Sequence, residues 1–370
     1  MPAVHDVLTD VPGKPGRFWG DHTDFVGPVY PPRRLLNLLG SRWAYNLIRV
    51  VAAVRLFLRR RHYEGVVTGG GASGLCFAWM QALCPWGRKP HVLIDCNWDL
   101  PPRRWEAWLK ALRIRLAARS AHRFVVWASH EVEDYARAFG VPEGQLLYVP
   151  FHGTAHDYQF EVRDDGYLFA GGNYDRDYPT LIEAVRPLDL PVWIATTRPE
   201  QLAGVDVPPQ VRVEGTDAAG FRQAMAAARL VVVPMQAGLL HSGGQQTCLN
   251  AMLMAKPTIA VGRKWAVDFL RDGDNGLIVD YQDAAGLRRA VEWVLRNPDA
   301  ARRMGERGRL DAARFTTQRT MESVYRLVKS AAPKPAPSAS EGEEKPLAGA
   351  RGWSRSWETT PHSLTRSERQ

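Results

Sequence analysis

The sequence predicts an α/β protein with two doubly wound parallel sheets, one in each half of the chain. Short β-branched runs alternate with helical patterns from residue 64 to about residue 330, a pattern typical of parallel sheets with helices on their faces. A polar, acidic connector ending near Gly166 interrupts the alternation, which resumes at Tyr167. The length of 370 residues is sufficient for two domain cores of ordinary size.

The alternation begins with residues 64–69, a β-branched run that opens into the glycine-rich turn Gly69–Gly71. An apolar helical segment at residues 75–83 follows, which gives the order strand, loop, helix. Gly140 before Pro142 provides a helix stop later in this half. The further elements expected here are strands at 91–95 and 123–128 and helices at 104–119 and 129–139. The segment 145–154 is expected to form one more strand that runs into the connector.

The most apolar long stretch, Trp43–Leu58, precedes the first of these strands. It is interrupted by Arg49 and Arg55 and is followed by Arg59–Arg61, so it is too short and too charged to span a bilayer. We interpret it as an amphipathic helix that packs on the sheet, with a role at a membrane surface as the alternative.

In the second half, strands are expected at 167–170, 191–195, 211–213 and 230–234, with helices at 178–185 and 218–228. We place an N-terminal domain at residues 1–155 and a C-terminal domain at residues 156–330. Beyond these the composition changes to Pro, Ala, Ser, Glu and Arg. Residues 331–370 are therefore predicted to form a disordered tail.

Composition and charge limit the class of protein. The chain has 48 Lys and Arg against 39 Asp and Glu, a net charge of +9, which favours ligands that carry phosphate or an anionic membrane surface. Its four cysteines form no CxxC pair, which argues against a zinc site and a disulfide framework. The first thirty residues lack the apolar core of a secretory signal, and no nucleic-acid-binding module is recognisable. We expect a cytoplasmic protein that binds no nucleic acid.

The most informative motif follows the strand that ends at Pro234. Gly243 and Gly244 leave backbone N–H groups accessible, and a helix is expected to begin near Gln246. Thr247 can cap this helix or donate a hydrogen bond. Such a helix start at the carboxyl edge of a parallel sheet is a place to hold an anion. An ordinary helix start without a ligand explains the same residues equally well.

This stretch resembles the donor-site segment of the retaining GT-B glycosyltransferases of family four, the glycosyl transferases group 1. Asn250–Met252 and Ala255–Ile259 stand in the register of that family's motif, and three further segments, 169–184, 269–279 and 128–150, are also similar to it. The resemblance implies the GT-B fold, in which two Rossmann-like domains face a cleft. It also implies transfer of a sugar from a nucleotide-diphosphate donor, with retention of configuration and without a metal ion or another cofactor.

The family pattern assigns donor-binding roles to residues of the second half. Ser242 and Asn250 stand where the family carries its pair of glutamates, and neutral hydrogen bonds are worth about 1 kcal/mol against about 1.5 to 3 for charged ones. Arg176 is the expected diphosphate clamp, with a solvated arginine paired to a neighbouring aspartate as the alternative. Arg176 and Ser242 are the catalytic candidates, and Arg263 and Lys264 are secondary anion ligands. The predicted donor site comprises Gly171, Gly172, Asn173, Arg176, His241, Ser242, Gly243, Gly244, Gln245, Gln246, Thr247 and Asn250.

The first half departs further from the family. A histidine that approaches the sugar in the family is absent, and Asp95 and Asn97 stand there instead. The family's opening strand with its glycine-rich loop is not recognisable in the first sixty residues, so we expect a trimmed or rearranged N-terminal domain. His130 and Glu131 are compatible with an acid/base pair, but charges on the surface at a helix start explain them more simply. The residues expected on the acceptor or sugar side are Gly70, Gly71, Ser73, Asp95 and Asn97.

Together these observations predict a metal-independent glycosyltransferase that acts on a cell-envelope, polysaccharide or lipid-linked acceptor. The basic first half is expected to contact an anionic membrane, at the inner face of the membrane, because arginines gather there. Two alternatives remain. One is a degenerate GT-B subunit that binds a glycan or a partner without turnover, and the other is a nucleotide-sugar epimerase or a phosphorylase-like enzyme of the same fold.

Overall fold

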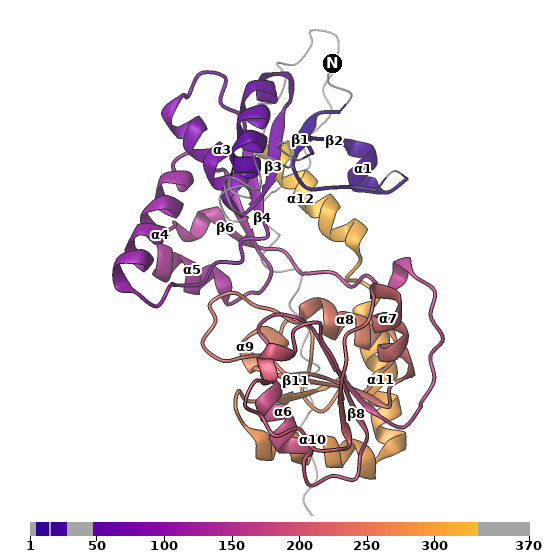
Figure 1. Ribbon diagram of the computed structural model, residues 1–370. Coiled ribbons are helices and arrows are strands. Elements are labelled where there is room, and N and C mark those ends of the chain that lie inside the picture. The colour runs from indigo at the N-terminus through magenta and orange to yellow at the C-terminus, as the bar shows by residue number, and fades with distance from the viewer. Residues whose placement is uncertain (1–4, 15, 28–46, 332–370) are drawn as a thin grey trace, which may run out of the picture. The chain divides into compact units, whose positions relative to one another are not determined.

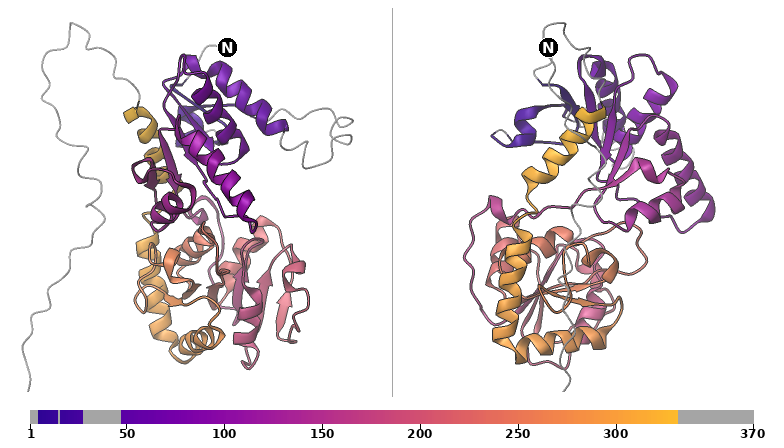
Figure 2. Two further views of the ribbon diagram at one scale, coloured as in Figure 1. Left: turned by 90° about the vertical axis from the view of Figure 1, so that its left-hand side faces the viewer. Right: turned by 180° about the vertical axis from the view of Figure 1, so that it is seen from behind.

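The protein contains two six-stranded sheets in which every strand pair is parallel, as a computed structural model shows (Figures 1 and 2). The structure describes residues 5–14, 16–27 and 47–331. Helices cover both faces of each sheet. The predicted α/β architecture with two doubly wound parallel sheets is therefore confirmed. The predicted tail, apart from residue 331, lies outside the described residues.

The first sheet has the strand order β2-β1-β3-β4-β5-β6. Its strands are short and mostly buried on both sides, as expected of a parallel sheet covered by helices. In β4, for example, all four side chains are buried. The strands are β1 (Val7–Thr9), β2 (Thr23–Phe25), β3 (Gly65–Gly69), β4 (His91–Ile94), β5 (Arg123–Val126) and β6 (Leu146–Tyr148).

The expectation that the first half lacks an opening strand was wrong. β1 lies inside the sheet, between β2 and β3, with Val7 opposite both Thr23 and Gly65. Val7, Leu8 and Thr9 are fully buried. A glycine-containing loop follows, and its first residue, Asp10, accepts hydrogen bonds from the Gly69 N–H and the Ser73 hydroxyl. The N-terminal segment thus forms part of the core of the first half.

Two groups of helices cover the first sheet. Helix 47–59 and the helices α3, α4 and α5 pack on one face. The other face is covered by α1 and by α12, the last helix of the described chain. Val324 and Val328 of α12 pack there against Val7, Val67 and Val92. The bounds are α1 (Phe18–His22), α3 (Ala72–Leu83), α4 (Arg104–Ala118), α5 (Glu131–Phe139) and α12 (Thr317–Ala331).

The position of α12 bears on the predicted domains. Its place in the sequence assigns it to the second half, yet it contacts β3 and β4 of the first sheet. The Thr320 hydroxyl donates to the Pro150 carbonyl, 3.1 Å away, and Lys329 forms ion pairs with Asp6 and Glu64. The boundary at residue 155 stays a prediction, but the chain crosses back to the first sheet at its end.

The second sheet has the order β12-β11-β10-β7-β8-β9. α6 and α10 pack on one face, and α7, α8 and α9 pack on the other, with α11 against α8. The strands are β7 (Leu168–Gly171), β8 (Val192–Ala195), β9 (Val211–Val213), β10 (Leu230–Val233), β11 (Thr258–Val261) and β12 (Leu277–Val279). The helices are α6 (Tyr178–Val185), α7 (Ala218–Ala227), α8 (Gln245–Leu253), α9 (Arg263–Ala266), α10 (Ala284–Arg296) and α11 (Pro298–Ala312).

Local sequence signals fix many of these helix ends. The carboxylates of Asp177, Asp217 and Asp283 each accept a backbone N–H in the first turn of α6, α7 and α10, which satisfies donors that a helix start leaves free. Gly140 ends α5 in the left-handed conformation with φ 65°, which glycine adopts without strain. The loops after β4, β7 and β10 leave the carboxyl edges of their sheets, where ligands of such folds bind.

Candidate functional site

A cavity of about 410 Å³ is lined by residues of both halves. The first half contributes the loops after β4, β5 and β6, and the second half contributes the loops after β7 and β10. Eleven of the predicted site residues line this cavity. The full lining comprises Asp95, Asn97, Trp127, Phe151, Asn173, Tyr174, Asp175, Arg176, His241, Ser242, Gly243, Gly244, Gln245, Gln246 and Thr247.

Arg176 points its guanidinium into the wall of this cavity. Nε donates to the Gly171 carbonyl at 3.1 Å, and Nη1 donates to the Tyr174 carbonyl at 3.1 Å. Desolvation lowers the pKa of Arg176, yet a guanidinium stays charged in proteins. Among the described residues no carboxylate forms an ion pair with it, and Asp177 instead caps α6. The alternative of a solvated arginine paired to a neighbouring aspartate is therefore wrong.

Glycines bring the backbone close to this cation. A Cβ at Gly172, where φ is 136°, would lie 2.7 Å from the guanidinium nitrogens of Arg176, so the side chain can fold back only over a glycine. A Cβ at Gly243 would lie 3.9 Å from Arg176 Nη1. Gly244 has φ 80° and immediately precedes α8. The glycine loop, the start of α8 and the guanidinium thus share one wall, which favours an anion.

His241 is held between the two halves by two aspartates. Its Nδ1 lies 2.5 Å from Asp99 Oδ2, and its Nε2 lies 3.2 Å from Asp175 Oδ2. Burial alone would lower the pKa of His241, but the hydrogen bonds and charges of Asp175 and Asp99 outweigh burial and raise this pKa to about 9. His241 is therefore an imidazolium at neutral pH. The same partner holds the pKa of Asp99 below its usual value, against the effect of burial.

Glu131 and His130 connect the halves at Ser242. Glu131 is 2 % exposed and accepts backbone N–H groups of Trp127, Ala128 and Ser242 at 2.9, 3.1 and 2.5 Å. The ring of His130 is hydrogen-bonded through Nε2 to the Ser242 hydroxyl at 2.8 Å. Interpreting these two residues as charges on the surface was therefore wrong. Ser242 lines the cavity, but its hydroxyl and its N–H are both engaged by the first half.

Several other predicted residues do not line the cavity. Asn250 Oδ1 accepts the N–H groups of Thr154 and Ala155 at 2.7 and 2.9 Å, so this side chain ties α8 to the segment after β6. The Ser73 hydroxyl donates a hydrogen bond to Asp10 Oδ2, 2.6 Å away. Lys264 and Arg263 pair with Asp134 and Asp272, respectively. Gly70, Gly71, Gly171 and Gly172 also lie outside the lining.

Asp95 supplies a carboxylate from the first half. It follows β4 with φ 54°, a backbone conformation that costs energy for a residue other than glycine and is common at functional sites. Oδ1 accepts the Trp127 indole N–H at 2.9 Å, and Oδ2 accepts no hydrogen bond from the described residues. Desolvation raises the pKa of Asp95, and the nearby charge of the Asp10 carboxylate raises this pKa further. The Asp95 side chain nevertheless remains accessible to solvent, so a substrate can reach it.

The sequence did not indicate Trp127, Phe151, Asp99 or Asp175 as site residues. Trp127 and Phe151 pack edge to face, with ring centroids 5.2 Å apart, and lie where strands β5 and β6 end. The ends of all strands in a parallel sheet meet at one edge, which could have singled out these positions. No group of three or more His, Cys, Asp or Glu in the described part of the chain is arranged to hold a metal ion.

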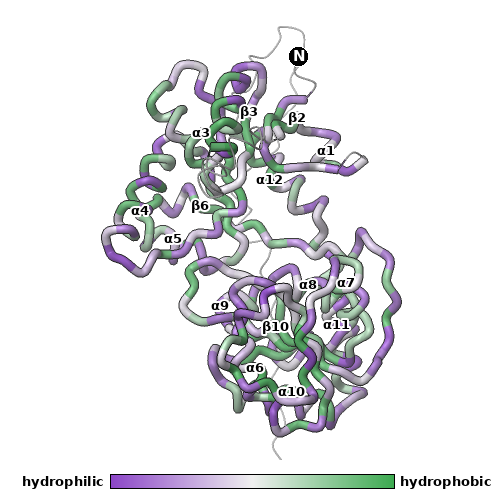
Figure 3. Tube along the Cα trace, in the orientation of Figure 1, coloured by the Kyte–Doolittle hydropathy of each residue, from purple (hydrophilic) through white to green (hydrophobic). Residues whose placement is uncertain are grey.

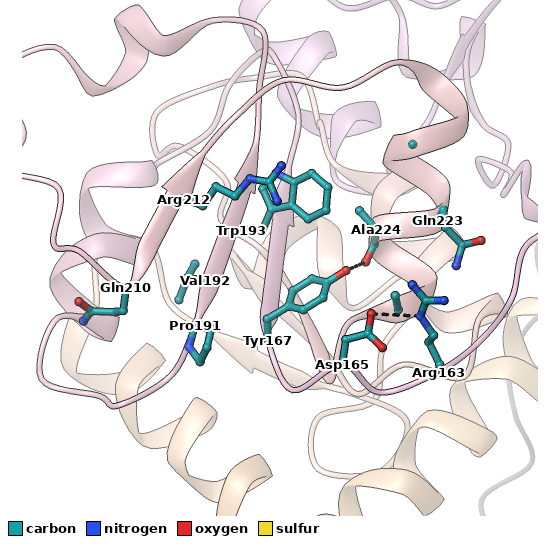
Figure 4. A pocket seen from close by; sticks show the side chains of 12 residues that line it. Arg163, Asp165, Tyr167, Pro191, Val192, Trp193, Gln210, Arg212, Gln223 and Ala224 are labelled. Carbon is teal, nitrogen blue, oxygen red and sulfur yellow. Dashed lines mark hydrogen bonds and ion pairs between the residues drawn. The ribbon is translucent and has the colours of Figure 1, made fainter.

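A second cavity, of about 490 Å³, lies entirely in the second half, beside β7, β8, β9 and α7 (Figure 4). Its polar groups are already partnered. Arg212 covers the Trp193 ring at 4.3 Å, the Tyr167 hydroxyl donates to the Ala224 carbonyl, and Arg163 pairs with Asp165. It contains none of the predicted site residues, so the smaller cavity is the candidate functional site.

Comparisons with known proteins match part of the second half to a known family. The family described as glycosyl transferases group 1 matches residues 168–297. The curated "Putative glycosyltransferase EpsD" of Bacillus subtilis is 31% identical over 88 residues, which cover 24% of this chain and 23% of that protein. The lipopolysaccharide core biosynthesis glycosyltransferase LpsE of Rhizobium meliloti is 43% identical over 51 residues, 14% of each chain. The matched segments thus span about a quarter or less of these relatives.

Solved structures extend the likeness to both halves. Anabaena HepE in complex with UDP-glucose has a TM-score of 0.64 and 13% identity, covering 88% of this chain and 99% of its own. Sucrose-phosphate synthase from Thermosynechococcus elongatus has a TM-score of 0.63 and 18% identity, covering 84% of each chain. At such identities the likeness concerns the fold. The chain has the GT-B fold, and its residues 168–297 match the glycosyl transferases group 1 family.

Proposed function

We propose that the protein is a glycosyltransferase that moves a sugar from a nucleotide-diphosphate donor to a hydroxyl acceptor. The observation that carries this proposal is Arg176. Its charged guanidinium lies in the cavity wall beside Gly243 and the start of α8, and no described carboxylate pairs with it. Asp175 acts on Arg176 only through its charge and is already paired with His241. A diphosphate would supply negative charge in direct contact with the guanidinium.

Stabilisation of the leaving diphosphate is then the main catalytic task of the second half. The guanidinium offers bidentate contacts to phosphate oxygens, and the helix start adds about half a positive charge. The imidazolium of His241 lines the same cavity and adds a further positive group, partly offset by its two aspartates. These groups would meet the charge that develops on the leaving group, so we expect activity without a divalent metal ion.

The first half would hold the acceptor. Asp95 Oδ2 and Asn97 face the cavity from the strand-end side and can accept a hydrogen bond from a sugar or acceptor hydroxyl. Retention of configuration is expected from the resemblance to family four. HepE was solved with UDP-glucose, LpsE is named for lipopolysaccharide core biosynthesis, and TarM was solved with UDP and α-GlcNAc-glycerol. These names favour a UDP-sugar donor and an acceptor from the cell envelope.

The test is calorimetric titration of the protein with UDP, GDP and ADP, followed by release of the same diphosphate from a panel of nucleotide sugars. Arg176→Ala should weaken binding of the preferred diphosphate by about 1.5 to 3 kcal/mol, the range for hydrogen bonds to charged groups. Arg176→Lys should recover part of it, because a single ammonium cannot bind in a bidentate manner. Arg186→Ala, at an exposed ion pair with Asp206, is the matched control.

The proposal fails if no diphosphate binds, or if Arg176→Ala binds as tightly as the parent. The alternative is a GT-B subunit that binds a glycan or a partner without turnover, and Asn250 and Ser242 are the residues that favour it. Both are engaged in contacts between segments of the protein rather than free for a donor. Binding of a diphosphate with no release from any nucleotide sugar would favour that alternative.

A further inference from the structure

The helices on one face of the first sheet form a surface that is basic and apolar at once. In residues 47–63, 72–90 and 103–120 there are thirteen Lys or Arg and one acidic residue, Glu106. Seven of these cations are exposed: Arg61, Arg88, Arg103, Arg104, Arg113, Arg115 and Arg119. Glu106 is itself paired with Arg103. Helix 47–59, α3 and α4 follow one another on this face. We call the outward side of these three helices the helical-layer surface.

Helix α4 exposes a stripe of large apolar side chains. Trp105 and Trp108 are each 60% exposed, and Leu112 is 43% exposed. Spacings of three and four residues place them on one face of the helix, and Arg115 and Arg119 continue the same face toward its end. Figure 3 shows green and purple segments alternating along α4, in keeping with this mixture. Exposed tryptophans beside arginines are unusual for a surface that contacts only water.

The stripe continues over the neighbouring helices. Leu83, the last residue of α3, is 77% exposed, and Trp86, which follows the helix, is 73% exposed. Helix 47–59 exposes only aliphatic side chains, because its arginines are half-buried. These exposed residues are Leu47, Val50, Val54 and Leu58.

Hydrogen bonds join the three helices at these positions. The Trp79 indole donates to the Arg113 carbonyl at 2.8 Å, and Arg88 donates to the Arg119 carbonyl at 2.8 Å. Arg60, which follows helix 47–59, donates to the Trp86 carbonyl at 2.8 Å. The exposed apolar groups therefore belong to one connected layer rather than to scattered loops.

We propose that the helical-layer surface docks on an anionic lipid bilayer. Tryptophan rings lie favourably at the headgroup level of a bilayer, aliphatic side chains insert below it, and arginines bind anionic headgroups with about 1 kcal/mol each near the surface. A second copy of the chain is a poorer occupant, because two such surfaces would oppose their arginines. No helix of the described residues is long and apolar enough to cross a membrane, so contact from one side is the mode that fits.

This docking places the candidate site close to the bilayer. Lys110, in the middle of α4, donates to the Asp99 carbonyl, and Asp99 holds His241 at the cavity. The tryptophans of α4 lie within two turns of Lys110 on the same helix. If the proposed glycosyl transfer is correct, the acceptor is then a molecule anchored in that bilayer; the docking itself does not depend on the reaction.

The experiment is flotation of the full chain with vesicles of phosphatidylcholine, with or without phosphatidylglycerol. The parent should float with the anionic vesicles, and salt should weaken this binding. The double variant Trp105→Ala/Trp108→Ala should lose at least about tenfold in partitioning, since each indole buries a large apolar area. Trp293→Ala removes a tryptophan that is 37% exposed on α10 of the second half, and it should bind like the parent.

Equal partitioning of the double variant and the parent would overturn the proposal. So would equal binding to vesicles that lack phosphatidylglycerol, or a parent dimer that the double variant converts to a monomer. Arg176→Ala separates docking from the proposed reaction, because it should float like the parent while losing diphosphate binding. Diphosphate binding by the double variant confirms that it is folded.

Discussion

The bridge formed by Asp99, His241 and Asp175 predicts a stability that depends on pH. The pKa of His241 rises from 6.5 to about 9 in the folded protein, and each unit corresponds to 1.36 kcal/mol. The bridge therefore contributes roughly 3 kcal/mol when the imidazole is protonated. Because only 14% of the His241 side chain is exposed, solvent screens little of this interaction.

The sign follows from the raised pKa. The contribution is complete below about pH 6.5, falls between pH 6.5 and 9, and is lost above pH 9. The described part of the chain, about 310 residues, unfolds with an entropy of about 0.65 kcal/mol per degree. His241→Gln should therefore lower Tm by about 5 °C at pH 6, and the difference should shrink toward pH 9.5.

Differential scanning calorimetry across this pH range measures the effect. Asp99→Asn should remove part of the pH-dependent contribution, because Asp175 still pairs with the imidazolium. His156→Gln, at an exposed residue outside the bridge, should keep the pH profile of the parent. A difference in Tm between His241→Gln and the parent that stays constant from pH 6 to pH 9.5 would refute the reasoning.

Two further substitutions test the site and its support. Gly172→Ala places a Cβ 2.7 Å from the Arg176 guanidinium at φ 136°. We therefore expect about 1 to 3 kcal/mol of strain, measured by scanning calorimetry, and weaker diphosphate binding, measured by calorimetric titration. Unchanged binding would contradict the assigned position of Arg176. Asn250→Ala leaves the N–H groups of Thr154 and Ala155 without their acceptor. In urea unfolding it should lower the free energy of unfolding by about 1 to 3 kcal/mol. Asn250→Asp keeps an acceptor oxygen and should lower the free energy of unfolding less.

Much of the fold could be predicted because its signals are local. The helix α6 has the predicted bounds, Tyr178–Val185, since the Asp177 cap and Pro179 define its start. β10 was recognisable from an uninterrupted β-branched run. β1 was missed because three residues, Val7–Thr9, show no periodicity, and only their pairing with β2 and β3 makes them a central strand.

The candidate site was predictable only in part. Residues 173–176 and 241–247 were expected to meet, because the resemblance to family four assigned both segments to the donor site. The roles of Glu131 and Asn250 depend on contacts with Ser242 and Thr154, 111 and 96 residues away. No local pattern encodes such contacts. The buried Glu131 was therefore interpreted as a charge at a helix start, and Asn250, which joins α8 to the segment after β6, was interpreted as a donor ligand.

The return of α12 to the first sheet has a consequence for how the chain is made. During synthesis from the N-terminus, the face of the first sheet around Val7 and Val67 has only α1 as a cover until the last fifteen described residues, Thr317–Ala331, leave the ribosome. The second sheet can fold earlier, as an insertion within the first. A fragment that ends before Thr317 should therefore expose an apolar face and aggregate, and adding α12 as a separate peptide should restore its solubility.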